Sequence, residues 1–404
     1  MVAMSQPAWL SILGIGEDGV DGLSGTARRV LTEAAFVFGA TRHLALGCDL
    51  IRGEAIPWPV PLGDPVPLLL SRRPGRCVVL ASGDPFWFGI GSLLARGIPA
   101  GEFICLPQPS SFSLACARLG WSLQATATLS VCGRPVDALA PALQPGARLL
   151  VLCADASSPA AIVGLLGQRG FEAATLHLMQ ALGGPRERIV TLRTDQELPG
   201  DIDPLTVLAI ELPRGGRSIP MACGIDDAAF EHDGQMTRRE IRALTLSALA
   251  PRRGELLCDI GCGSGSIAIE WMLRHPDCRA IGIEPDPERR ARAARNAREL
   301  GVPALDLREG LAPAALDGLP AADAVFIGGG AGDDGVLDAA RALVRPGGRM
   351  VVNAVTLETE ALLIAHQASH GGFLTRYGVD RLDRIGNLHT LRPAMRILQW
   401  VWHG

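Results

Sequence analysis

Residues 256–266 read Leu-Leu-Cys-Asp-Ile-Gly-Cys-Gly-Ser-Gly-Ser, an apolar run followed by closely spaced glycines. The apolar run predicts a buried strand, and the glycines predict a tight turn into a helix. Glycine lets the backbone approach a ligand closely and present N–H groups to it. The spacing is G-x-G-x-G, with Ser266 where the dinucleotide fingerprint needs its last glycine. We therefore expect an amino-acid-bearing nucleoside, not a pyrophosphate, at Gly261, Cys262, Gly263, Ser264 and Gly265.

A carboxylate follows at the end of the next expected strand. Glu284 comes about twenty residues after the turn, where a carboxylate can accept hydrogen bonds from both ribose hydroxyls. Each feature has a plainer interpretation, a tight strand-to-helix turn for the glycines and a solvated acid beside Arg289 and Arg290 for Glu284. Their joint order and spacing favour the ligand site.

Short apolar runs alternate with helical stretches along the whole chain, which predicts an α/β fold with mostly parallel sheets. In the first half, strands are expected at residues 9–13, 77–81, 103–106, 148–153 and 205–212. In the second half, they are expected at 255–260, 279–284, 323–327 and 349–352, with the run 389–402 closing the sheet. Thr237 and Glu240 have the form of a capping box at the start of a helix.

Two turn-rich stretches divide the chain. At 404 residues, the length allows two or three domains. Residues 106–111 suggest two small lobes, about 1–106 and 107–213, with a cleft between them. The polar, glycine-rich residues 214–218 are expected to be a linker, followed by a second domain at 219–404.

Composition limits the function classes. The chain has 48% hydrophobic residues, 20% charged residues and a net charge of −4, so there is no basic field for nucleic acid. No long uncharged apolar run or signal peptide is found, and we expect a cytoplasmic protein without membrane contact. Its ten cysteines include no C-x-x-C pair, so they are expected to be buried apolar residues and not metal ligands. The chain has no lysine, so anionic ligands depend on arginine or on backbone N–H groups.

The second half carries a family resemblance. Residues 226–242, the glycine turn, residues 328–330 and residues 353–358 together resemble the class I methyltransferases that act on precorrin-6 derivatives in cobalamin biosynthesis. The resemblance implies that S-adenosyl-L-methionine is surrounded by Thr237, Gly261 to Gly265, Glu284, Leu311 and Ala312. It also implies that Gly328, Gly329 and Gly330 let a flat macrocycle approach; a flexible loop is an equally good interpretation. Asn353 is either a substrate contact or a structural cap. His232 is a candidate acid, or packs an entry loop.

The first half resembles the tetrapyrrole methylases, class III methyltransferases that hold S-adenosyl-L-methionine between two lobes. The resemblance covers most of residues 8–212. Its main segments are 80–89 and 109–115, which place Ser82, Gly83, Asp84, Ser110 and Ser111 at the cofactor; Asp84 is also a plausible helix cap. A literal G-x-G-x-x-G lies at Gly14 to Gly19, but no ribose-binding acid follows it, which excludes a dinucleotide site. Cys132 stands where related sequences tend to have histidine, which leaves this half's activity open.

The order of the two halves resembles the fused precorrin-6Y C5,15-methyltransferases (decarboxylating). Membership implies methylation of precorrin-6Y at C-5 and C-15 and decarboxylation of the ring C acetate side chain, giving precorrin-8, with no metal. We also expect a homo-oligomer. Two alternatives stay open. The first half could be a non-catalytic binding module, or the second could methylate a nucleic acid or small amine, although no N-P-P-Y or D-P-P-Y motif follows the fourth strand.

Overall fold

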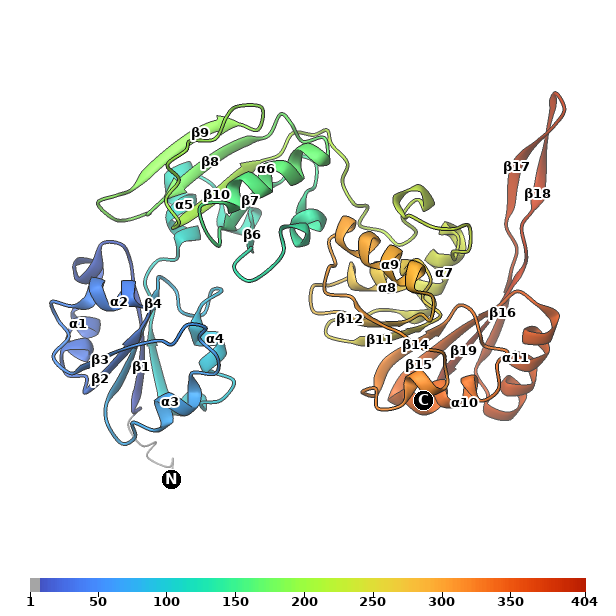
Figure 1. The fold of residues 1–404 in the computed structure, drawn as a ribbon, viewed down its shortest axis with the longest axis horizontal. Helices are drawn as coiled ribbons and strands as arrows, with labels where there is room; N and C mark the ends of the chain where they lie inside the picture. The colour runs from blue at the N-terminus through green and yellow to red at the C-terminus, as the bar shows by residue number, and fades with distance from the viewer. Residues whose placement is uncertain (1–7) are drawn as a thin grey trace. The chain divides into compact units, whose positions relative to one another are not determined.

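The computed structural model describes residues 8–404, which form two compact units. The first unit comprises the chain up to Val136 together with Gln144–Arg217, and the second comprises Asp137–Leu143 with Ser218–Gly404. The expected α/β class is confirmed, since each unit is built from sheets covered by helices (Figure 1). Within the described residues, no helix is long and apolar enough to cross a membrane.

The first unit begins with a five-stranded parallel sheet in the order β3-β2-β4-β1-β5. Alternate residues of the strands point to opposite faces, so each face has its own core. Ala27 and Leu31 of α1 cover one face, and Leu69 of α3 and Leu94 of α4 cover the other. The elements are β1 (Leu10–Ile15), α1 (Gly25–Thr32), β2 (Phe36–Gly39), α2 (Thr41–Gly47), β3 (Glu54–Pro57), α3 (Val66–Leu70), β4 (Cys77–Ser82), α4 (Ile90–Leu94) and β5 (Phe103–Leu106).

A second five-stranded sheet completes this unit, in the order β6-β7-β10-β8-β9. Only β6 and β7 are parallel neighbours; the other pairs are antiparallel. The elements are α5 (Ser111–Leu119), β6 (Ala127–Ser130), β7 (Arg148–Leu152), α6 (Ser158–Gln168), β8 (Thr175–Gln180), β9 (Arg188–Arg193) and β10 (Thr206–Glu211).

The second unit has a seven-stranded sheet in the order β13-β12-β11-β14-β15-β19-β16. The first five strands of this order, β13, β12, β11, β14 and β15, run parallel. Strand β19 lies between β15 and β16 and is antiparallel to both. The elements are α7 (Arg239–Leu249), β11 (Leu256–Ile260), α8 (Ser266–Met272), β12 (Arg279–Ile283), α9 (Pro287–Glu299), β13 (Asp306–Arg308), β14 (Ala322–Ile327), α10 (Val336–Leu343), β15 (Val344–Ala354), α11 (Leu357–His370), β16 (Phe373–Tyr377) and β19 (Ile397–His403).

Helices cover both faces of this sheet. Helices α7, α8 and α9 pack on one face around the fully buried Trp271, and α10 and α11 pack on the other around Trp400. Figure 1 shows these two helical layers on opposite sides of the strands. Because parallel strands end at one edge, the loops after β11, β14 and β15 lie together, where open α/β sheets bind ligands.

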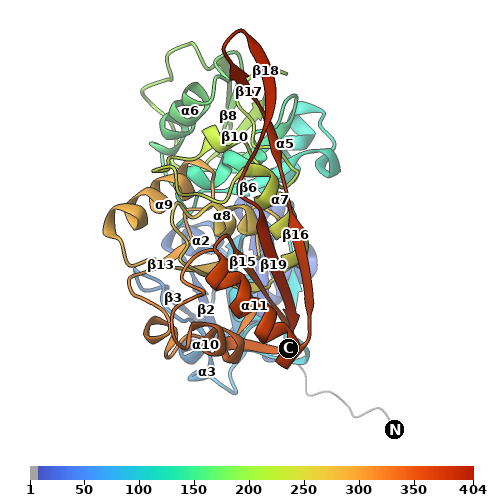
Figure 2. The ribbon, with the colours of Figure 1, turned by 90° about the vertical axis from the view of Figure 1, so that its right-hand side faces the viewer.

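Two details of the predicted second domain are wrong. The run 389–402 is not one strand, because β18 (Leu388–Pro393) pairs only with β17 (Asp380–Ile385) in a separate hairpin that projects from the sheet (Figures 1 and 2). The expected capping box is also absent. Helix α7 begins at Arg239 with Arg238 as its N-cap and no side-chain cap, and Glu240 instead pairs with Arg381.

The prediction that the cysteines are buried holds for six of the ten. Cys77, Cys153 and Cys258 are among the buried ones, whereas Cys105 and Cys223 are partly buried and Cys48 and Cys132 are exposed. Burial raises the pKa of the Cys258 thiol to about 12, and the neighbouring Asp259 adds to the shift. A buried thiol of this kind is not nucleophilic at neutral pH.

Candidate functional site

A cavity of about 620 Å³ opens at the carboxyl edge of the second unit's sheet. Its walls are the segment 234–238 before α7, the glycine turn after β11, the loop after β14 and the end of β15. The base of the β17–β18 hairpin supplies a further wall through Val379 and Arg381. The predicted site residues that line it are Thr237, Gly261, Cys262, Gly263, Ser264, Gly328, Gly329 and Asn353.

The glycine turn adopts a backbone that other residues rarely use. Gly261 and Gly263 have φ angles of 69° and 54°, in the left-handed region. A Cβ atom on Gly261 would also lie only 3.2 Å from the carbonyl oxygen of Gly329. Glycine is therefore needed here both for the turn and for the close approach of the loop after β14.

Asp259 is a site residue that the sequence prediction left out. It is the fourth residue of β11, it is fully buried, and it lines the cavity. Its Oδ2 accepts a hydrogen bond from the N–H of Ala268 at 3.1 Å, whereas its Oδ1 has no partner in the described chain. Burial raises the pKa of this carboxyl to about 7, the N–H of Ala268 opposes the shift, and the charge of Glu284 adds to it. A buried oxygen without a partner is costly, and it suits a cationic or hydrogen-bond-donating ligand.

Glu284 is 3% exposed and lies outside the cavity lining. Its Oε2 accepts from the N–H of Gly263 at 2.9 Å, and its Oε1 accepts from that of Asp286 at 3.1 Å. The carboxylate thus holds the glycine turn against the end of β12. Each carboxylate oxygen can accept a second hydrogen bond, so the ribose contact expected from the sequence stays a prediction.

Five other predicted residues also lie outside the cavity lining. Gly265 is the N-cap of α8, behind the turn, and Leu311 is 66% exposed beside the partly buried Ala312. The Nδ1 atom of His232 accepts a hydrogen bond from the N–H of Gly234 at 3.0 Å, which makes it part of the entry-loop turn. Gly330 follows the two lining glycines with a φ of 78°.

Asn353 is fixed by a buried polar cluster at the end of β15. Its Nδ2 donates to Thr245 Oγ1 at 3.0 Å, and its Oδ1 accepts from Gln399 Nε2 at 2.9 Å. Thr245 and Gln399 are fully or almost fully buried, whereas Asn353 borders the cavity at 8% exposure. The cluster gives the Asn353 amide one defined orientation, in which its second N–H can face a ligand.

A buried ion pair holds the cavity wall that precedes α7. The Arg242 Nε atom donates to Glu270 at 2.5 Å, and both side chains are fully buried. Glu270 also accepts from the N–H groups of Gly224 and Ile225, and Arg242 donates to the carbonyl oxygen of Thr237 at 2.6 Å. The pair therefore connects α7 and α8 to the segment that carries Thr237.

Arginine is the main source of positive charge around the cavity. Arg238, Arg289 and Arg381 all line it. Arg289 donates to Asp233 at 2.9 Å, and Arg381 donates to Glu240 at 2.5 Å, so each is partly neutralised and held in place. Guanidinium groups at a cavity rim suit a ligand that carries carboxylates.

In the first unit, three loops meet at the carboxyl edge of the parallel sheet. A Cβ atom on Gly14 would lie 1.9 Å from the carbonyl oxygen of Gly83, and Gln108 N donates to that oxygen at 3.0 Å. The loops after β1, β4 and β5 therefore touch, which brings Gly83 and Asp84 near Ser110 and Ser111. The unit's hollow of about 430 Å³ lies elsewhere, beside Arg148 and Glu211.

The predicted polar residues of this edge have local roles as well. Ser110 caps α5 through a hydrogen bond from Ser113 N at 3.1 Å, and Asp84 Oδ1 accepts from Phe86 N at 2.9 Å. Ser82 Oγ lies 2.8 Å from both Arg42 Nη2 and His43 Nε2. Burial lowers the pKa of His43 to about 4, with Arg42 adding to the shift, so the ring is neutral at pH 7.

Comparisons with known proteins agree with this two-part architecture. Residues 10–196 match the family of tetrapyrrole (corrin/porphyrin) methylases, and residues 228–404 match the precorrin methyltransferase domain. A Sinorhizobium protein named precorrin-6Y C(5,15)-methyltransferase (decarboxylating) is 52% identical over 407 residues, 99% of this chain and 98% of its own. The chain belongs to the precorrin-6Y C5,15-methyltransferase (decarboxylating) family.

Shorter relatives of this methyltransferase family match part of the chain. A Salmonella typhimurium protein named cobalt-precorrin-6B C(15)-methyltransferase (decarboxylating) is 35% identical over 162 residues, 39% of this chain and 83% of its own. The solved C-terminal domain of precorrin-6Y C5,15-methyltransferase from Rhodobacter capsulatus is 44% identical and covers 46% of this chain and all of its own, with a TM-score of 0.44.

Proposed function

We propose that this chain methylates precorrin-6Y at C-5 and C-15 with S-adenosyl-L-methionine and decarboxylates the ring C acetate side chain, giving precorrin-8. The proposal rests on family membership over 99% of the chain combined with one observation, the unpartnered Oδ1 atom of Asp259 beside the glycine turn in a cavity edged by arginines. We further propose that residues 1–213 and 219–404 are the two catalytic domains, with residues 214–218 as linker.

The cavity of the second unit suits S-adenosyl-L-methionine in size and in chemistry. About 620 Å³ is within the usual range of small-molecule sites, roughly 300–1,000 Å³. Asp259 Oδ1 and Ser264 Oγ are buried atoms without a partner in the described chain, and they match the ammonium and hydroxyl groups of the cofactor. Thr237, Gly261, Cys262 and Gly263 would complete the contact, with Glu284 ordering the turn. When bound, the cofactor supplies a methyl group on a positively charged sulfur.

The protein's own part in methyl transfer is to position and to exclude water. An in-line displacement needs the acceptor carbon close to the methyl group and in line with it. Gly328 and Gly329 have no side chain that would keep a flat macrocycle away. Arg238 and Arg381 at the rim are placed to bind its carboxylates. Asn353, held by Gln399 and Thr245, has an N–H free to orient the substrate.

Decarboxylation needs an electron sink and a proton for the carbon that loses the carboxyl group. The conjugated macrocycle can act as the sink. His232 is our candidate acid; as the imidazolium it would donate from Nε2 and return to the neutral ring, and protonation of Nδ1 would break the hydrogen bond from Gly234 N. We assign C-15 methylation and decarboxylation to the second unit and C-5 methylation to the first.

The first unit would hold its own cofactor at the edge where Gly83, Asp84, Ser110 and Ser111 meet. Support comes from the match to tetrapyrrole methylases over residues 10–196 and from the three touching loops. Cys132 is exposed, and its Sγ lies 3.4 Å from the carbonyl oxygen of Cys153. If only the backbone of residue 132 contacts the ligand, the replacement of histidine by cysteine would leave the activity of this unit intact.

Mass spectrometry of precorrin-6Y incubated with the full chain and methyl-labelled S-adenosyl-L-methionine tests the proposal. We expect two labelled methyl groups and the loss of one carboxyl group. Asn353→Ala should reduce the second methylation and the carboxyl loss while leaving the first methyl. If the unmodified chain adds only one methyl group and removes the carboxyl group, the first half is a binding module. Equilibrium binding of the cofactor would then give one site per chain instead of two.

A further inference from the structure

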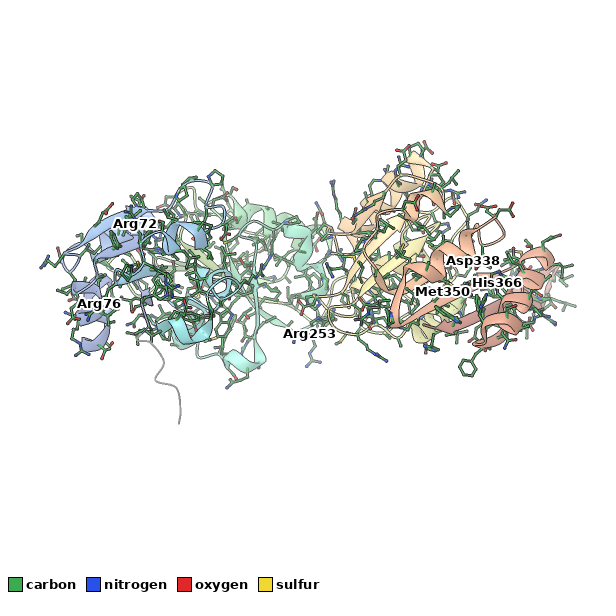
Figure 3. The ribbon with its side chains drawn as sticks, turned by 90° about the horizontal axis from the view of Figure 1, so that it is seen from below. Arg72, Arg76, Arg253, Asp338, Met350 and His366 are labelled. Carbon is green, nitrogen blue, oxygen red and sulfur yellow. The ribbon has the colours of Figure 1, made fainter. Side chains whose placement is uncertain are left out.

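Three side chains of metal-binding types meet on the helical layer formed by α10 and α11. His366 and His370 lie one turn apart on α11, and Asp338 lies on the neighbouring α10. One ligand atom from each falls within 4.8 Å of the others. Figure 3 shows Asp338 and His366 next to one another where the two helices pack. None of the three lines the cavity.

The two imidazoles are free to bind. Histidines at positions i and i+4 point to the same side of a helix, and their ring centroids are 5.6 Å apart. Within residues 8–404, neither ring makes a hydrogen bond. His366 is partly buried against Trp400, with ring centroids 5.9 Å apart, and this packing limits its orientations.

The carboxylate is held by a neighbour. Asp338 Oδ1 accepts from Arg341 Nη2 at 3.1 Å, and the Arg341 guanidinium stacks on the ring of Trp402. One oxygen of Asp338 is thus oriented by arginine and the other is available. A ligand held by an outer hydrogen bond in this way is a regular feature of metal sites.

We propose that Asp338, His366 and His370 form a binding site for a divalent transition-metal ion of the zinc class. Two imidazoles with one carboxylate suit zinc and its neighbours, and not Mg²⁺ or Ca²⁺, which prefer oxygen ligands. Ligand atoms of a tetrahedral zinc ion lie about 3.3 Å apart. The present separation of up to 4.8 Å is larger, so the side chains would move closer together when the ion binds.

A bound ion would fasten the end of α11 to α10. The chain between them contains β15, which carries Asn353, and the loop that follows it. Closing this loop with a metal restricts the unfolded chain and stabilises the folded one. The site would therefore be a structural metal site that links α10 and α11 on one face of the sheet. Its occupancy does not depend on the proposed catalytic function.

Zinc binding to the full chain tests the inference. Chelator-stripped protein is titrated with Zn²⁺ against a chromophoric competitor, alongside H366A, H370A, D338N and the double variant H366A/H370A. We expect wild type to bind one more Zn²⁺ per chain than the double variant, and each single substitution to weaken that site more than about tenfold. The matched control is H389A, which removes an exposed histidine of β18 and should bind as wild type does.

Two further measurements separate this site from the thiols. Co²⁺ bound here should give visible bands without the near-ultraviolet charge transfer of a thiolate. Zn²⁺ at a hundred times its Kd should raise the thermal midpoint by about 5 °C in wild type and not in H366A/H370A. The proposal would be overturned if wild type and the double variant bound the same number of Zn²⁺ ions, or if H389A lost as much Zn²⁺ binding as the double variant. The cluster would then consist of solvated side chains at a helix end.

Discussion

The side-chain amide of Gln399 donates to Asn353 Oδ1 at 2.9 Å, joining β19 to the end of β15 beneath the cavity. Replacing Gln399 by leucine keeps the volume and leaves this oxygen without a partner, which costs about 1–3 kcal/mol when buried. We expect Gln399→Leu to lower the urea midpoint and to raise KM for the tetrapyrrole in the carboxyl-loss reaction.

Gln367→Leu is the control for that prediction. Gln367 also donates through its Nε2 atom, to the carbonyl oxygen of Gly372, but it is only partly buried and does not line the cavity. The Gln367→Leu variant should therefore leave KM for the tetrapyrrole unchanged. If both variants change KM equally, Gln399 does not act through Asn353.

The Asp259 carboxyl predicts a pH-dependent affinity for the cofactor. With a pKa of about 7, it is mostly neutral at pH 6 and ionised at pH 8. A cationic ligand binds the ionised form better, so Kd for S-adenosyl-L-methionine should fall as pH rises through 7, by at most about tenfold per unit. Asp259→Asn should bind more weakly with a flatter profile, measured by calorimetry.

The same group affects the stability of the ligand-free protein with a defined sign. Its folded pKa is above the ordinary value of 3.8, so the folded state retains a proton that the unfolded chain loses. The free energy of unfolding should fall as pH rises from about 4 to about 7. Asp259→Asn should lack this component, whereas Asp277→Asn, a change at an exposed carboxylate, should keep it. An unchanged profile in Asp259→Asn would contradict the raised pKa.

Local patterns accounted for most of the fold. The strand and turn at 256–266 were predictable because apolar runs and glycine spacing are properties of neighbouring residues. The hairpin was missed because the β-forming run 389–402 continues through Pro393, and only the pairing of β18 with β17 separates it from β19. The capping box failed because α7 begins at Arg239 with Arg238 as its N-cap, so Thr237 lies one residue too early to cap the helix, and Glu240 pairs with Arg381, more than a hundred residues away.

The site was predictable only where it is local. Asp259 had a visible signal, a carboxylate inside an apolar strand beside glycines, but only the structure shows that one of its oxygens lacks a partner. Asp338 is separated in sequence from His366 and His370, so no local motif joins them. Leu311 and Ala312 were expected through resemblance alone, and the structure places neither in the cavity lining.

The buried pair of Arg242 and Glu270 predicts a large asymmetry between single and double changes. Glu270→Leu leaves the N–H groups of Gly224 and Ile225 without their acceptor, and the buried Arg242 charge keeps only its carboxylate partner Asp227 at 3.1 Å. Removing one partner of such a pair costs about 3–5 kcal/mol. The double variant Arg242→Met/Glu270→Leu should be more stable than Glu270→Leu in urea unfolding. It should still bind the cofactor weakly, since Thr237 loses its anchor. Additive losses would argue against direct coupling.

Gly14 provides a test of the first unit alone. A methyl group at Gly14 would lie 1.9 Å from the carbonyl oxygen of Gly83, so Gly14→Ala must separate the loops after β1 and β4. We expect this variant to lose the C-5 methyl group while keeping carboxyl loss, both counted by mass spectrometry. The control is Gly25→Ala in α1, where a Cβ meets no atom within 4 Å and alanine favours the helix. If the Gly14→Ala enzyme still adds both methyl groups, these loops do not form the cofactor site of the first unit. If it also fails to remove the carboxyl group, the two reactions are not divided between the units as proposed.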